Sequence, residues 1–129
     1  MRIKLRLSLI LLPLCLALGG CGTTVLDEAP DEIRGTWVTD APAYQGRAFI
    51  IEANSVTLLR GEAGPVTHQF ERIELVEQGA RLLYRFHHSD VSGGMDMLEV
   101  QPDFDHGGFV HLGNLPQVSW YRDSTGVTD

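Results

Sequence analysis

The chain is poor in the residues that cross-link a fold, bind metals or catalyse. It has two cysteines, Cys15 and Cys21, and neither lies beyond residue 21. No disulfide can therefore stabilise the region that follows, which must be held together by its core. The sequence contains no Gly-x-Ser-x-Gly elbow and no recognised metal-ligand spacing, so it predicts no enzyme.

Long apolar runs are also missing. The longest, from Leu7 to Leu18, contains Pro13 and is shorter than the roughly 20 apolar residues that a membrane-spanning helix requires. Arg2, Lys4 and Arg6 precede it. A basic start, a short apolar stretch and small residues form the order of a secretory signal.

The end of this segment, Leu18-Gly19-Gly20-Cys21, resembles the bacterial lipobox. The resemblance implies a signal peptide over residues 1–20 and a diacylglyceryl group on the Cys21 thiol. Residues 21–29 would then be an acylated N-terminus and a flexible tether. Gly22 is not the aspartate that retains lipoproteins at the inner membrane, which favours an outer-membrane anchor with the domain in the periplasm. The alternative is a secreted protein that keeps Cys21 in its mature chain.

Charge after the signal is strongly negative. Three of the ten Lys and Arg residues precede Cys21, which leaves seven arginines against seventeen acidic residues, a formal charge of −10. Such a surface argues against nucleic acid and against anionic lipid headgroups. The lipid anchor must therefore hold the protein to the membrane.

The remaining sequence reads as short strands between turn residues. A single helical turn is expected over 29–33, and some eight strands follow, with a β-bulge near Arg72-Ile73. This pattern predicts an all-β domain over residues 30–124, a small antiparallel meander closed into a barrel. A two-sheet sandwich is the alternative. Residues 125–129 are expected to be a frayed tail.

Two motifs resemble lipocalin-like barrels. Gly35-Thr36-Trp37 is similar to their Gly-x-Trp opening, and Trp120-Tyr121-Arg122 is similar to their closing strand. The resemblance implies that Arg122 packs over Trp37 and that Gly35, Trp37 and Arg122 form a structural closure. If the large residues Phe49, Phe70, Tyr84, Phe86 and Trp120 all point inward, they fill a barrel of about eight strands.

Two loops concentrate polar residues between the predicted strands. The first is flanked by His87, His88, Asp90 and Asp96, and the second by Asp103, Asp105, His106 and His111. Both could hold a cation only if they meet in space, and adjacent strand residues such as His87 and His88 point to opposite faces. We therefore predict exposed loops that contact a ligand or partner, without a metal or other cofactor. Met95 and Met97 are predicted to pack in the core.

Three function classes remain after these exclusions. The favoured class is a non-catalytic binding or interaction module, anchored to the membrane, whose partner is an unknown protein or a small apolar ligand. It includes a lipocalin-type carrier and an envelope protein inhibitor, for which an acidic surface would suit a basic enzyme. Metal binding at the His/Asp loops is the last class.

The lipobox gives a direct prediction. Replacing the acceptor thiol, Cys21→Ser, should leave the precursor unacylated and outside the detergent fraction, since Cys21 is the anchor. Metabolic labelling with a radioactive fatty acid measures this, with the unchanged chain as control. Label retained by the variant would show that another residue carries the lipid.

Overall fold

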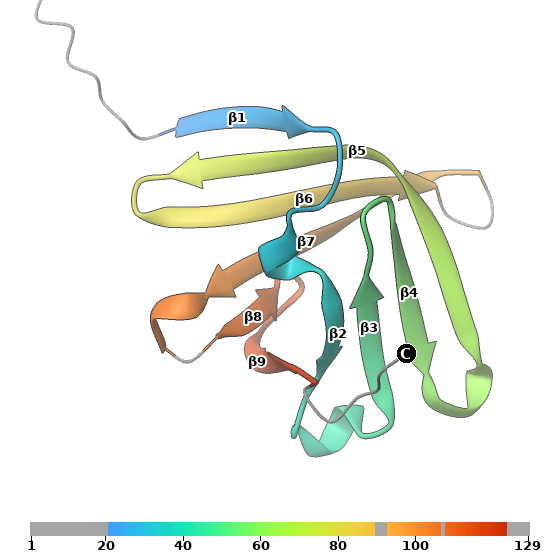
Figure 1. The fold of residues 1–129 in the computed structure, drawn as a ribbon. Helices are drawn as coiled ribbons and strands as arrows, with labels where there is room; N and C mark the ends of the chain where they lie inside the picture. The colour runs from blue at the N-terminus through green and yellow to red at the C-terminus, as the bar shows by residue number, and fades with distance from the viewer. Residues whose placement is uncertain (1–20, 90–92, 107, 124–129) are drawn as a thin grey trace, which may run out of the picture.

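The protein is an antiparallel sheet whose strands close into a barrel (Figure 1). The computed structural model describes residues 21–89, 93–106 and 108–123. Nine strands are described: β1 (Cys21–Leu26), β2 (Gly35–Val38), β3 (Arg47–Ile51), β4 (Ser55–Arg60), β5 (Pro65–Gln78), β6 (Arg81–Ser89), β7 (Met95–Asp103), β8 (Phe109–Leu112) and β9 (Leu115–Arg122). Short 3-10 turns are the only helical segments in this part of the chain: η1 (Asp31–Ile33), η2 (Pro42–Tyr44), η3 (Gly61–Ala63) and η4 (Phe104–His106). None of the described helices is long and apolar enough to cross a membrane.

Strands β2 to β9 form the barrel. Each pairs with its neighbour in sequence, and β9 returns to pair with β2, so the eight-stranded ring is closed. The predicted antiparallel meander barrel of lipocalin-like type is confirmed, and the two-sheet sandwich is not observed. Closure removes the exposed strand edges that an open meander would leave.

Strand β5 is long enough to pair with two different strands along the same edge. Its first half, from Pro65 to Gln69, pairs with β4, whereas its second half, from Ile73 to Gln78, pairs with β1. The ladder to β6 shifts register between Phe70 and Arg72, next to the predicted bulge. A bulge bends a strand, which explains how β5 follows the barrel wall and then runs beyond it.

Strand β1 differs from the sequence prediction of a flexible tether over residues 21–29. All six residues of β1 pair with β5, from Cys21 opposite Gln78 to Leu26 opposite Ile73. Thr23, Thr24 and Val25 are β-branched and suit an extended strand. The second half of β5 would otherwise present an unpaired edge, so an adjacent segment with modest strand propensity is recruited to it.

The interior is filled by aromatic side chains. Trp37, Phe49, Tyr84, Phe86 and Trp120 are each at most 4% exposed. Their rings form two groups, one of Trp37, Phe49 and Trp120 and one of Tyr84 and Phe86, and Phe49 meets Trp120 edge to face at 5.1 Å between centroids. Phe70 is half-buried and stacks on Phe86 at 4.5 Å. An eight-stranded barrel is just wide enough for side chains to fill, and this one holds large ones.

The two ends of the barrel carry different connections, because successive strands run in opposite directions. The η1 end is formed by η1, the β5–β6 turn at Gly79–Ala80 and η4. The η2 end is formed by η2, η3, the end of β6, the start of β7 and the β8–β9 turn at residues 113–114. Figure 1 shows the end of β6 and η4 on opposite sides of the molecule.

The seam between β2 and β9 is short and depends on Trp37 and Arg122. These residues are opposite each other in the ladder, and the Arg122 guanidinium lies 5.1 Å from the centre of the Trp37 ring. The buried indole N–H donates to the Ile33 carbonyl at 3.0 Å. Gly35 precedes this contact with φ of +131°, a backbone conformation that favours glycine.

The seam gives a stability prediction. Removing the buried indole, Trp37→Ala, should lower the free energy of unfolding by about 3–5 kcal/mol, the usual cost of deleting a large core aromatic. Arg122→Ala, which leaves the core intact, should cost only about 1 kcal/mol, the value of an exposed cation–π contact. Thermal melts of the anchor-free domain measure both. Equal effects of the two changes would contradict this description of the seam.

Candidate functional site

The predicted candidate residues His87 and His88 point to opposite sides of the barrel wall. His88 lies inside and is 6% exposed, and it is one of two buried polar residues in the described part of the chain, with Ser55. His87 lies outside and contacts the Glu74 carboxylate through Nε2. An imidazole inside an otherwise apolar barrel is costly unless it is hydrogen-bonded, which directs attention to its partners.

The side chain beside His88 is His68, from β5. The two rings lie 4.4 Å apart between centroids, and their Nδ1 atoms lie 3.3 Å (His88) and 3.2 Å (His68) from the Ser89 carbonyl oxygen. A carbonyl oxygen only accepts, so each Nδ1 donates, and Nε2 of each neutral ring is left as an acceptor. The site is therefore a pair of imidazoles that can receive hydrogen bonds from a ligand.

These histidines line a pocket at the η2 end, which we call the η2-end pocket. Its volume is about 530 Å³, and its walls include Leu58, His68, His88, Asp96, Glu99 and Asn114. Asp96 is opposite His88 in the β6–β7 ladder and is exposed. The Glu99 carboxylate on this wall already faces Arg85, whose Nε lies 3.7 Å from it. Asp96 and the two imidazoles still give the pocket hydrogen-bond acceptors, which suit a cationic, donor-rich ligand.

In the described residues, the first part of β7 lacks a strand neighbour on the side away from β6. Strand β8 pairs with β7 only from Val100 to Asp103, so Met95 to Leu98 have a strand neighbour on the β6 side alone among the described strands. The Met97 N–H turns to the Asp96 side chain instead, at 2.8 Å.

The prediction that Met95 and Met97 pack in the core is wrong. Met95 is 61% exposed and Met97 is 40% exposed. Both are opposite outward-facing residues of β6, Met95 with Ser89 and Met97 with His87. The side-chain period of two assigns both methionines to one face, but it does not say which face is inward. They add adaptable apolar surface next to the η2-end pocket.

The second group of predicted residues lies at the other end. Asp103 ends β7, Asp105 lies in η4, and His111 on β8 contacts the Val118 carbonyl through Nδ1 at 3.1 Å. Asp90 and the side chains of Cys21 and His106 lie outside the described residues. The described residues that flank the two loops therefore lie at opposite ends of the barrel, and the described part of the chain contains no group of three or more His, Cys, Asp or Glu placed to hold a metal ion.

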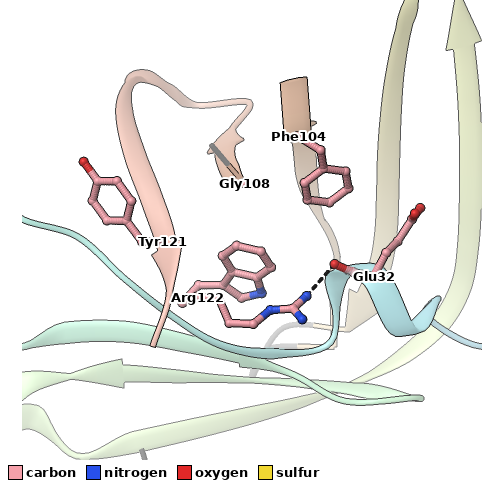
Figure 2. A pocket seen from close by; sticks show the side chains of 6 residues that line it. Glu32, Phe104, Gly108, Tyr121 and Arg122 are labelled. Carbon is pink, nitrogen blue, oxygen red and sulfur yellow. Dashed lines mark hydrogen bonds between the residues drawn. The ribbon is translucent and has the colours of Figure 1, made fainter. Parts of the chain in front are cut away.

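A separate pocket lies over the seam, at the η1 end (Figure 2). Its volume is about 500 Å³, and Trp37, Phe104, Tyr121 and Arg122 form aromatic and cationic walls. Arg122 Nη2 donates to the Glu32 carbonyl at 2.5 Å, the dashed contact in Figure 2. Its cation is already engaged by that carbonyl and by the Trp37 ring, so the arrangement favours closure over ligand binding.

Two ionisable groups are clearly perturbed. Burial, together with the hydrogen bond that its hydroxyl donates to the Glu32 carboxylate, raises the pKa of Tyr84 far above its ordinary value. The pKa of Glu74 is lowered, first by its hydrogen bond with His87 and then by the Arg72 cation, whose Nη2 lies 3.5 Å from the carboxylate. Both groups link elements together and neither lines the η2-end pocket.

No known family model matches the sequence, and no curated protein or solved structure is significantly similar to it.

The lowered pKa of Glu74 predicts acid sensitivity. The ordinary pKa of this carboxyl, which applies in the unfolded state, is 4.5. Because the pKa is lower in the folded state, the folded state binds fewer protons at this carboxylate than the unfolded state. Its contribution to stability is full above that value and is lost as the pH falls through the lowered pKa. Glu74→Gln should therefore melt lower than the unchanged chain at pH 7, with the difference shrinking toward pH 3.

The control is Glu77→Gln, the same chemical change at an exposed position on β5. Its melting temperature should stay close to that of the unchanged chain throughout the pH range. A Glu74→Gln deficit that does not change with pH would contradict the ionic origin of the contact.

Proposed function

We propose that this chain is a lipid-anchored envelope protein whose barrel is a non-catalytic module that binds a basic protein partner at the η2-end pocket. The proposal rests mainly on the His68–His88 pair. The two rings lie inside the end of an apolar barrel and line a pocket that opens to solvent. The Ser89 carbonyl satisfies the Nδ1 atom of each ring, and a binding role for Nε2 accounts for a polar pair at the end of an apolar barrel.

Charge supports the choice of a basic partner. The chain after residue 20 carries a formal charge of −10, and the pocket adds the exposed Asp96 carboxylate to the two imidazoles. Opposite charge steers a partner to the site and fixes its orientation. The exposed Met95 and Met97 supply apolar contact at the rim, as adaptable interfaces require.

The other candidate functions receive less support. A carrier of a small apolar molecule needs interior space, whereas Trp37, Phe49, Tyr84, Phe86 and Trp120 occupy the centre of the barrel. Shared metal binding by the two His/Asp loops requires them to converge, and the strand ends that flank them lie at opposite ends of the barrel. An envelope inhibitor fits within the proposal, since an inhibitor is one kind of partner-binding protein.

Site-specific photo-crosslinking tests the proposal in cells that make the full chain. A benzophenone amino acid at Asn114, on the pocket wall, should give one discrete protein adduct. The same probe at Gln78, at the η1 end, is the matched control and should not give that adduct. Absence of an adduct at position 114, or the same adduct from both positions, would contradict the proposed site.

Substitutions then separate binding from folding. Asp96→Asn changes an exposed carboxylate and should reduce the adduct several-fold without altering the melting temperature. His88→Leu should also abolish the adduct while leaving the melting temperature equal or higher, since an apolar side chain replaces a buried polar one. A large fall in the melting temperature of His88→Leu would instead assign His88 a structural role.

A further inference from the structure

Strand β1 joins the proposed lipid attachment site directly to the barrel, without a flexible linker between them. Cys21 is the first residue of β1, and its Cα partner in the ladder is Gln78, the last residue of β5. Paired antiparallel residues lie about 5 Å apart between Cα atoms. A flexible tether of nine residues would instead separate its ends by roughly 15–18 Å in any direction.

The attachment site is therefore tied to one end of the barrel. Gln78 leads into the β5–β6 turn, which belongs to the η1 end. Figure 1 shows the start of β1, the β5–β6 turn and η4 on the same side of the molecule, away from the end of β6. A lipid on Cys21 would bring this end, and not the η2-end pocket, toward a bilayer.

The surface near this attachment point carries exposed apolar side chains. Leu82 is 41% exposed and Phe104 is 43% exposed, and both line one shallow pocket of about 480 Å³ with Arg81. Leucine and aromatic side chains partition favourably into the bilayer interface, and an arginine can extend its cation toward headgroups. Asp103 and Asp105 line the same pocket, so charge alone would not bring this end to an anionic membrane.

We propose that the η1 end is a membrane-facing surface, held against the bilayer by the acylated Cys21 and the pairing of β1 with β5. Leu82 and Phe104 rest at the lipid interface, and the η2-end pocket is directed away from the membrane. This orientation rests on the proposed acylation of Cys21. It explains why a strand rather than a tether follows the anchor: a fixed anchor presents the binding end to the periplasm.

Depth-dependent fluorescence quenching tests the orientation in the lipidated full chain. The chain has no cysteine after Cys21, so Leu82→Cys and Phe104→Cys each provide a single thiol for a fluorophore. Asn114→Cys and Glu62→Cys are matched controls at the η2 end. The proteins are reconstituted in phosphatidylethanolamine–phosphatidylglycerol vesicles that contain a nitroxide-labelled lipid.

Quenching at positions 82 and 104 should exceed that at positions 62 and 114 several-fold. Equal quenching at the two ends, or stronger quenching at the η2 end, would overturn the proposed orientation. Failure of the anchoring itself is recognised separately, because a chain without fatty acid label would not co-sediment with the vesicles at all.

A second variant tests the cause of the orientation. In a paired edge strand, adjacent residues alternate in donating their N–H groups to the neighbour, so Thr23→Pro with Thr24→Pro must remove at least one bond to β5. The acylated double variant should stay on the vesicles while the difference between the two ends falls toward equality. A difference that persists unchanged would show that β1 does not set the orientation.

Discussion

The seam between β2 and β9 is the contact on which the rest of the structure depends. Only two residue pairs join these strands, Trp37 with Arg122 and Val38 with Tyr121, so the first and last strands of the barrel meet over a short ladder. The seam is strengthened from both sides. The Trp37 ring fills the interior beneath the Arg122 guanidinium, and the Asp123 N–H donates to the Thr36 carbonyl at 2.8 Å. Without it, β2 and β9 would become exposed edges.

Closure and filling together decide where this barrel can bind. A closed wall prevents strand addition around most of the ring, and the aromatic core leaves the ends as the accessible concave surfaces. The two ends differ in chemistry. The η1 end combines the seam, exposed Leu82 and Phe104, and the start of β1, whereas the η2 end combines two imidazoles, the exposed Asp96 carboxylate and exposed methionines. Such a difference would suit the proposed anchor at one end and the proposed partner site at the other.

Much of the fold could be predicted from the sequence because strand alternation and turn residues are local signals. Leu82 to His88 alternates along β6, and the bulge in β5 appears as a change of parity after Phe70. Strand β1 could not be predicted in this way, since the unpaired half of β5 that recruits it is a non-local feature. The pairing of His68 with His88 is equally non-local. His68 shares a face with Phe70, which marks it as inward, but the neighbour across the ladder depends on the register that the bulge sets. The placement of the strand ends that flank the two His/Asp loops could have been predicted, because consecutive connections of a meander alternate between the two ends of the barrel.

Amide hydrogen exchange tests the closed barrel most directly. The N–H of Asp123 bonds across the seam, and that of Phe70 bonds to the Asn54 carbonyl within the wall. If the seam is closed as described, the Asp123 amide should exchange orders of magnitude more slowly than that of Glu62, an exposed residue in the β4–β5 connection. Exchange at Asp123 as fast as at Glu62, with Phe70 still protected, would show an open sheet and contradict the closed, filled barrel.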